Sequence, residues 1–183
     1  MFVRTDRLFL RPAWLEDAPE LARAIGDKTI VRNLARVPWP YREQDARDAI
    51  ARERHPYLPS LLVTLPDEGG RIVGGIALSD DEGRTSLGYW VARGYHGRGY
   101  ATEAGRAVLG LARLAGHRCV HSGHFADNPA SGRVLRKLGF RPTGTVAQRE
   151  SKGRGGAVVP SVEYALDLAE ADGPQDAPMR EAA

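Results

Sequence analysis

A glycine-rich loop between a strand and a helix restricts the fold of this chain more than any other segment. Residues 85–92, rich in aromatic and β-branched side chains, predict a strand. In residues 100–115 apolar positions recur at spacings of three and four, which predicts a helix with one buried face. Gly97 and Gly99 lie between the two. Because the first amides of a helix lack internal partners and glycines let a ligand approach the backbone, this arrangement predicts an anion-binding turn.

Basic side chains are concentrated in the same part of the chain. Residues 93–154 hold 12 Lys or Arg and 3 Asp or Glu, a net charge of +9, whereas residues 1–92 hold 13 and 14, a net charge of −1. Arg93 and Arg98 lie beside the two glycines. Such a segment suits a polyanion, and nucleic acid, a phosphorylated cofactor or a solvated basic face all fit it.

Two widespread phosphate-binding loops do not match these residues. The P-loop needs Lys-Ser or Lys-Thr after its last glycine, and neither pair follows Gly99. The dinucleotide-binding loop needs a third glycine where this chain has Thr102. It also needs an acidic residue about 20 positions further on, and none stands near Val120.

The remaining pattern predicts one mixed α/β domain. Alternation and helical periodicity predict further strands at 7–12, 60–65, 71–79, 118–125, 140–148 and 158–168, and further helices at 15–27, 42–55 and 128–138. Turns are expected at 67–70 and 80–83. Hairpins combined with helical crossovers favour an α/β or α+β sandwich around a mixed sheet.

Length and composition favour a single domain followed by a short tail. We expect the domain over residues 1–168 of the 183, and a disordered tail over residues 169–183, which are acidic and nearly free of large apolar side chains. The single cysteine, Cys119, excludes an internal disulfide framework. No apolar run predicts a membrane span and the first residues do not resemble a signal peptide, so we expect a cytoplasmic location without membrane contact.

Four short motifs, in order within residues 3–168, resemble the GCN5-related N-acetyltransferase (GNAT) superfamily, and within it the group typified by ribosomal-protein N-terminal acetyltransferases (RimJ and RimL). Residues 96–101 are similar to the family's pyrophosphate loop, with His96 where Gln or Arg is more common. Residues 100–104 look like the subgroup's continuation of that loop, and residues 5–12 like its opening strand. Residues 128–140 resemble the second cofactor motif.

The resemblance implies a GNAT-like fold, a mixed and mostly antiparallel sheet flanked by helices and splayed between the strands at 85–92 and 118–125. It implies acetyl-CoA as co-substrate, no metal, and direct transfer of the acetyl group to a primary amine. Backbone groups near Val91 would pair with the pantetheine arm. The residues implied to hold the rest of the cofactor are Gly97, Arg98, Gly99, Tyr100, Ala101 and Thr102 at the pyrophosphate, and Asn128 and Ser131 near the amide and thioester.

The second motif also has a local explanation. Asn128 before Pro129 is typical of a helix N-cap, and Gly139 is typical of a helix end, with Phe140 packing back. We expect Asn128 to serve as cap and cofactor contact together.

Neither usual acid–base group of the family stands at its expected place. Ser86 occupies the position where many relatives have Glu, and Leu135 lies where the subgroup often has Tyr. We take His124 as the candidate base, because histidine accepts protons near neutral pH, with an ordinary strand residue as the alternative. Ser131, a hydroxyl on an apolar helix face, is the candidate group to hydrogen-bond or protonate the departing thiolate. Glu103 is expected to be structural.

The acceptor amine is less constrained by the sequence. A peptide or protein N-terminus and a small-molecule amine both fit. The missing Glu favours an α-amino group, whose pKa of about 8 demands less of a base than the value of about 10.4 for lysine. Trp14, Trp39 and Tyr41 would line the acceptor pocket or belong to aromatic core, and residues 80–82 would attract a polycation such as an aminoglycoside or form a solvated turn.

Other functions remain as alternatives. The first is a catalytically idle acyl-CoA-binding or regulatory module, since both usual acid–base groups are missing. We do not expect a nucleic-acid partner, because the arginines follow a cofactor motif. A homodimer is left open.

Overall fold

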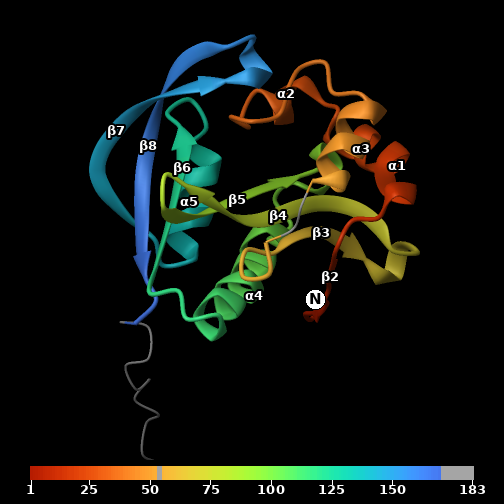
Figure 1. Cartoon of the computed structure of the whole chain (residues 1–183), viewed down its shortest axis with the longest axis horizontal. Helices are drawn as coiled ribbons and strands as arrows, with labels where there is room; N and C mark the ends of the chain where they lie inside the picture. The colour runs from red at the N-terminus through yellow and green to blue at the C-terminus, as the bar shows by residue number, and fades with distance from the viewer. Residues whose placement is uncertain (53–54, 170–183) are drawn as a thin grey trace, which may run out of the picture.

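The computed structural model describes residues 1–52 and 55–169, which form one eight-stranded sheet with helices on both faces (Figure 1). The strands are β1 (Val3–Arg4), β2 (Phe9–Arg11), β3 (Ser60–Leu65), β4 (Arg71–Asp81), β5 (Arg84–Val91), β6 (Cys119–Phe125), β7 (Arg141–Ser151) and β8 (Ala157–Asp167). Their order across the sheet is β1-β2-β3-β4-β5-β6-β8-β7. Each neighbouring pair is antiparallel except β5 and β6, which confirms the mixed, mostly antiparallel sheet that the resemblance implied.

The helices divide between the two faces of the sheet. They are α1 (Ala18–Ile25), α2 (Lys28–Val31), α3 (Glu43–Ala51), α4 (Tyr100–Leu114) and α5 (Pro129–Lys137), with short 3-10 turns at Leu15–Asp17, Pro66–Glu68, Arg93–Tyr95 and Lys152–Arg154. Leu21 and Ala46 of α1 and α3 pack on Leu62 of β3. On the other face Val108 of α4 and Leu135 of α5 belong to the larger core. None of the described helices is long and apolar enough to cross a membrane.

The predicted elements are present with shifted ends. The helix expected at 42–55 ends at Ala51. Asp80 and Asp81 belong to β4 rather than to a turn, because both pair with β5, and the turn contracts to Glu82 and Gly83, both with positive φ. The expected tail begins at residue 169, and its residues 170–183 lie outside the described part of the chain.

Two short elements were not predicted. β1 has two residues and α2 has four. Segments this short show no periodicity from which a strand or helix could be recognised. α2 is instead set by Asp27, whose carboxylate accepts a 2.7 Å hydrogen bond from the amide of Thr29.

The strands β5 and β6 pair at a single point. Ser86 and His121 form the one parallel bridge between them, whereas β4 and β5 pair from Gly74–Val91 to Asp81–Arg84. Beyond this bridge β5 and β6 diverge, as Figure 1 shows. The splay implied by the resemblance is therefore present, and it opens a gap in the middle of the sheet.

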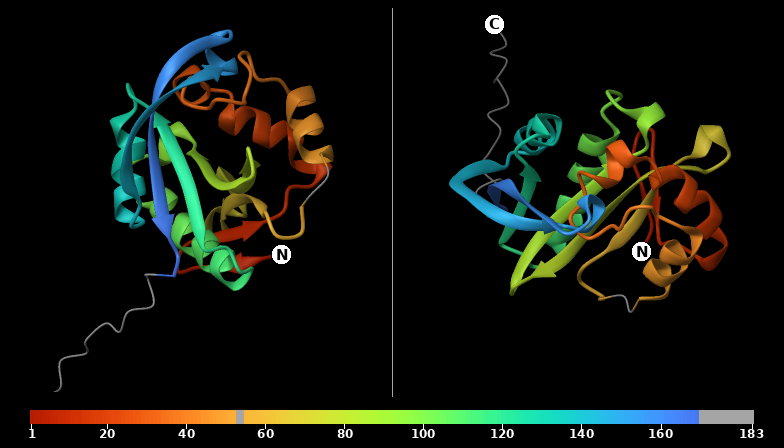
Figure 2. Two further views of the ribbon diagram at one scale, coloured as in Figure 1. Left: turned by 60° about the vertical axis from the view of Figure 1, so that its left-hand side comes forward. Right: turned by 90° about the horizontal axis from the view of Figure 1, so that it is seen from above.

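The hairpin of β7 and β8 arches to α2 and the loop behind it (Figure 2). The amide of Lys152 donates to the carbonyl of Ala35 over 2.9 Å, and Arg154 Nε donates to the carbonyl of Arg32 over 2.7 Å. Gly153 lies so close to Val31 that a Cβ there would stand 2.3 Å from the Val31 carbonyl oxygen. The hairpin tip is thus anchored to the loop after α2, on the far side of the gap.

The start of α4 is held by the N-terminal segment. Glu103 Oε1 accepts hydrogen bonds from Thr5 Oγ1 over 2.6 Å and from the amide of Arg7 over 2.9 Å. The guanidinium of Arg7 forms an ion pair with Glu103 over 2.6 Å, donates to the carbonyl of Arg98 over 3.0 Å and lies 4.9 Å above the ring of Tyr100. Glu103 therefore has the structural role expected from the sequence.

This ion pair predicts a pH-dependent contribution to stability. Partial burial opposes ionisation of Glu103, but hydrogen bonds from Thr5 and Arg7 outweigh it and lower the pKa of Glu103. A lowered folded-state pKa stabilises the fold above the unfolded-state pKa, and that contribution is lost as pH falls through the folded-state value. Glu103→Gln should reduce the unfolding free energy at pH 7 by about 1–2 kcal/mol.

Denaturant unfolding of both proteins at several pH values measures this effect. The difference between wild type and Glu103→Gln should shrink below about pH 4, as the wild-type carboxylate takes up its proton. Glu16→Gln removes the same charge from an exposed position and serves as the control. A difference that stays constant down to the lowest pH would contradict the assigned ion pair.

Candidate functional site

A cleft of about 1440 Å³ follows the gap between β5 and β6. One part of its wall comes from β5, the loop after it, and the first turns of α4 and α5. The other part comes from α1 to α3, the loop after α2, and the inner sides of β7 and β8. The cleft therefore connects the predicted cofactor loop with the opposite, N-terminal half of the fold.

The loop before α4 has the geometry of an anion cradle. Gly97 and Gly99 have φ values of +77° and +82°, a region that side chains rarely adopt. A Cβ on Gly97 would meet no atom within 4 Å, so the space beside it is open. Gly99 caps α4, whose first internal bond on this turn runs from the amide of Glu103 to the Gly99 carbonyl. The amides of Ala101 and Thr102, in the first turn of α4, therefore have no partner within the helix and point out of its positive, N-terminal end.

The Arg98 side chain lies outside the cleft lining, and Tyr100 lies between the cleft and the core. Tyr100 is buried in the main core. The Arg98 guanidinium lies 5.0 Å from the ring centroid of Tyr95. Among the described residues that line the cleft, Gly97, Gly99, Tyr100, Ala101 and Thr102 of the predicted pyrophosphate loop are present and Arg98 is not.

The free edge of β5 faces the gap with its backbone. The amide of Ala92 donates to Val73 of β4, and antiparallel bonds alternate, so the odd-numbered residues of β5 turn their backbone groups toward β6. His96 Nε2 lies 2.8 Å from the carbonyl oxygen of Val91. His96 therefore fixes the end of β5 against the loop. Among the backbone groups of Val91, the amide rather than the carbonyl is suited to pair with a pantetheine arm.

The start of α5 forms the wall opposite this edge. Asn128 precedes Pro129 at the helix start, but its side chain makes no capping hydrogen bond, so the expected role as a helix cap is wrong. Asn128 does line the cleft, and its expected contact with the cofactor stays a prediction. The other end of the helix is as predicted. Gly139 has φ +91°, and the amide of Phe140 donates to the carbonyl of Leu135 over 3.1 Å.

Ser131 is paired with a tyrosine across the gap. The hydroxyl oxygens of Tyr89 and Ser131 lie 2.7 Å apart, and Tyr89 also donates to the Ser131 carbonyl over 3.0 Å. Burial raises the pKa of Tyr89 to about 12, so its hydroxyl keeps its proton at neutral pH. From the sequence, Tyr89 was the alternative proton donor to Ser131, but the contact between the two residues could not be predicted, because they are 42 positions apart.

His124 lies on the helix side of the sheet. Its Nδ1 is 2.9 Å from the carbonyl oxygen of Phe125, and its ring centroid is 5.5 Å from that of Tyr164. A Cβ on Gly132 would stand 2.5 Å from His124 Nε2, so the ring packs directly under the first turns of α5. The imidazole reaches the cleft wall, but it is held between a helix backbone and an aromatic ring.

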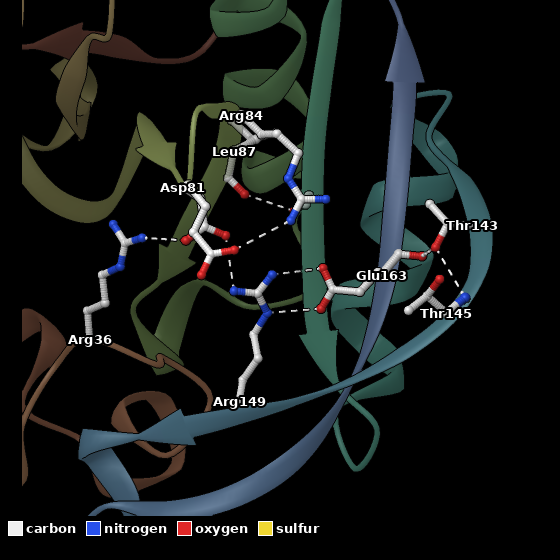
Figure 3. A network of polar contacts seen from close by, with 10 residues as sticks. Arg36, Asp81, Arg84, Leu87, Thr143, Thr145, Arg149 and Glu163 are labelled. Atoms are coloured by element: carbon white, nitrogen blue, oxygen red, sulfur yellow. Dashed lines mark hydrogen bonds and ion pairs between the residues drawn. The ribbon is translucent and has the colours of Figure 1, made fainter.

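The acidic residues at the far end of the cleft are paired with arginines (Figure 3). Arg149 binds Glu163 through two bonds of 3.0 and 3.1 Å and Asp81 through a third of 3.0 Å, and Arg36 binds Asp81 over 2.9 Å. Hydrogen bonds to Glu163 raise the pKa of Arg149 further. Asp80 accepts a bond from the amide of Gly83. Among the described cleft-lining carboxylates, each is therefore already engaged.

The aromatic residues considered for the acceptor pocket are separated in space. Tyr41 lines the cleft, whereas Trp14 belongs to a second, smaller hollow beside Ile50. Trp39 keeps 40% of its surface exposed. Trp90, which the sequence did not single out, lines the cleft floor, with its ring lying over Gly75.

A strand, a glycine cradle and a helix beside a splayed sheet were the features that the sequence resemblance implied. Comparison of the chain with models of known families shows to which family it belongs. The model of the acetyltransferase (GNAT) domain matches residues 7–141. The chain belongs to this GNAT family, and it is an acetyltransferase.

Individual relatives agree with this membership. An N-acetyltransferase named p20 from Bacillus licheniformis is 29% identical over 159 residues, which cover 82% of this chain and 88% of that protein. A GNAT-family acetyltransferase from Bacillus anthracis shares the fold with a TM-score of 0.77 at 22% identity, covering 92% of this chain and 99% of that one. RimL, a ribosomal L7/L12 α-N-protein acetyltransferase in complex with coenzyme A, has a TM-score of 0.76 at 20% identity, covering 91% and 98%.

The residues of this chain fit the co-substrate of the family, acetyl-CoA. The glycine cradle and the helix N-terminus suit the pyrophosphate, and the strand edge at Tyr89 and Val91 suits the amides of the pantetheine arm. Asn128 and Ser131 line the same cleft. In the described part of the chain no group of three or more His, Cys, Asp or Glu is placed to hold a metal ion.

The cradle predicts that Gly99→Glu weakens CoA binding at least ten-fold. A non-glycine residue at φ +82° costs about 1–2 kcal/mol, and the carboxylate would repel the pyrophosphate. Calorimetric titration with CoA measures the affinity, and the melting temperature verifies folding. Gly94→Glu adds the same charge at an exposed position of the preceding turn and should bind CoA nearly as wild type does. Unchanged affinity in folded Gly99→Glu would refute the assignment of the cradle.

Proposed function

We propose that this acetyltransferase moves the acetyl group of acetyl-CoA directly to an α-amino group, at the terminus of a peptide or protein or on a small molecule. The observation that carries the proposal is the cleft itself, which joins the cofactor cradle to a far end where each carboxylate of the described residues is already paired. Acetyl-CoA supplies an activated acetyl group as a thioester. The chain supplies the binding surface, the orientation and the proton transfers.

The Tyr89–Ser131 pair is suited to donate a proton to the departing sulfur. When Tyr89 donates its proton to Ser131 Oγ, the Ser131 hydroxyl is free to donate its own proton into the gap. Tyr89 then fixes the position of that hydroxyl, and its own high pKa prevents it from losing its proton at neutral pH. A positioned donor at a developing negative charge contributes about 2.7–4 kcal/mol to a reaction barrier.

The charge around the far end of the cleft favours an acceptor that is not polycationic. Asp81 and Glu163 are bound by Arg36 and Arg149, so the cleft offers a multiply charged amine no free carboxylate among the described residues. An aminoglycoside or polyamine is therefore disfavoured. An α-amino group, which is partly neutral near pH 8, needs only a weak base.

The location and partners follow the same proposal. Acetyl-CoA as donor and a lone cysteine without a disulfide partner favour the cytoplasm. The arginines near the loop are engaged within the protein, Arg98 with the ring of Tyr95 and Arg93 with Asp27, so neither nucleic acid nor a membrane is proposed as partner.

Release of CoA thiol with a panel of amines tests the acceptor class. The panel contains short peptides with free or Nα-acetylated ends, free amino acids, spermidine and an aminoglycoside. We expect turnover with free α-amino groups and little with acetylated peptides whose lysine remains free. Turnover confined to the polyamine or aminoglycoside would contradict the acceptor class, and tight CoA binding without turnover of any amine would favour an idle acyl-CoA-binding module.

Ser131→Ala separates a proton donor from a structural hydroxyl. We expect kcat to fall by about 10² to 10³ while CoA affinity stays within a few-fold, because the hydrogen bond matters most as the sulfur leaves. Tyr89→Phe should lower kcat less, since it removes only the group that positions Ser131. Steady-state kinetics and melting temperature are measured on the same samples. Normal kcat with a lowered melting temperature in Ser131→Ala would assign the hydroxyl to the fold alone.

A further inference from the structure

The two histidines at 121 and 124 of β6 lie on opposite faces of the sheet. Side chains alternate along a strand, and these two are three positions apart. Val120, on the face of His124, is fully buried in the core with α4 and α5. Phe125, on the face of His121, lies 4.9 Å from the Arg154 guanidinium of the arching hairpin. His121 therefore faces the half of the cleft under the β7–β8 hairpin, the far end at which the proposed function places the acceptor, and His124 does not.

His121 stands where the sheet begins to open. It forms the single β5–β6 bridge with Ser86. The family resemblance of the sequence led us to expect a Glu at the Ser86 position. Ser86, Gly88 and Trp90 share one face of β5, and Trp90 packs toward α1 and α3. Gly88 is about 7 Å along the strand from Ser86, at two residues of about 3.4 Å each. The imidazole is thus beside the closed end of the gap, partly exposed and in the cleft wall.

The proton donor lies on the other side of the same gap. Tyr89 and Ser131 meet on the face of α5, one residue beyond Gly88. An amine that attacks a thioester must lose a proton while the departing sulfur gains one. A base and an acid on opposite sides of the gap can serve these two transfers without neutralising each other.

Other groups on this face are already bound. Among the described residues from β4 to β8 and the loop after α2, the charged or titratable side chains on the same side are Asp81, Arg84, Cys119, Arg141, Arg149, Glu163, Asp167 and Arg36. Asp81 and Glu163 bind arginines, and Asp167 accepts from the amide of Ala169. Within the described residues, the hydrogen-bond contact of His121 is with the weak partner Cys119 Sγ at 3.6 Å.

We propose that the His121 imidazole is the general base that takes the proton from the acceptor amine, in place of the carboxylate that Ser86 replaces. The inference rests on the proposed function. The amine nitrogen bonds to the carbonyl carbon, and the carbon–sulfur bond breaks with its electron pair going to sulfur. The sulfur takes a proton from Ser131, which regains one from solvent. The proton lost by nitrogen goes to His121, which then releases it to solvent. No oxidant, reductant or metal enters this balance.

The pH profile of His121→Asn tests this role. With the best amine from the panel at a saturating concentration, kcat of wild type should fall on the acid side, because a protonated imidazole cannot accept the proton of the amine. His121→Asn should lower kcat about 100-fold or more and lose this acid limb, while CoA affinity stays unchanged. Cys119→Ser alters the neighbour of the imidazole on the same face and should retain both activity and profile.

His124→Asn decides between the two histidines. If this variant loses the acid limb and His121→Asn keeps it, the proposal is overturned and His124 is the base. Activity of His121→Asn within a few-fold of wild type over the whole pH range also overturns it.

A second measurement does not depend on finding an acceptor. The imidazole NMR signals of the protein saturated with acetyl-CoA are followed from about pH 5.5 to 9, and the His121 signal is the one missing in His121→Asn. We expect this signal to change protonation state within the range and to shift on addition of acetyl-CoA. A signal fixed in one protonation state overturns the proposal even if no amine is turned over. Failure of the amine panel alone, with a titrating His121, contradicts the acceptor class instead.

Discussion

The gap in the sheet depends on the point where β5 and β6 stop pairing. A parallel pair of strands normally continues through evenly spaced hydrogen bonds, but here Ser86 and His121 form the single bridge. Each strand is held on its other side by a long antiparallel partner, β4 or β8. The two halves of the sheet can therefore diverge while β5 stays paired with β4 and β6 stays paired with β8. The unpaired backbone edge of β5 is then available to a ligand.

The cradle for the pyrophosphate is held in place from far away in the sequence. Arg7 and Thr5 bind Glu103 on α4, and Arg7 also binds the carbonyl of Arg98 in the loop. This arrangement neutralises the Glu103 carboxylate in the first turn of α4, where a negative charge also stabilises the helix dipole. The N-terminal segment thus holds the cofactor loop in place through direct contacts, although more than 90 positions separate Arg7 from Arg98.

Charge is distributed along the cleft according to what each end binds. At the cofactor end, positive charge comes from backbone amides and is not cancelled by acidic partners. At the far end, Asp81 and Glu163 are matched by Arg36 and Arg149, and this network joins β4, the loop after α2, and both strands of the arching hairpin (Figure 3). The ion pairs that hold the hairpin over the cleft also neutralise the two carboxylates at this end of the cleft. The contacts that shape this end are therefore the same ones that make it a poor site for a polycationic acceptor.

The residue pattern alone predicted that a strand, a glycine loop and a helix follow one another over residues 85–115, and that the sheet is mixed. It also predicted the boundaries of β3, α4 and α5 to within a residue or two. These features are local, because glycines at 97, 99 and 139 and the spacing of apolar residues act over a few positions. Which side chains meet could be seen only in the folded chain. Tyr89 contacts Ser131, and Arg98 lies over the ring of Tyr95. Asp81 forms an ion pair with Arg149, and His121 and His124 lie on opposite faces of the sheet. The reason is physical: strand register and the packing of α5 set these distances, and neither is encoded in the residues next to the groups concerned.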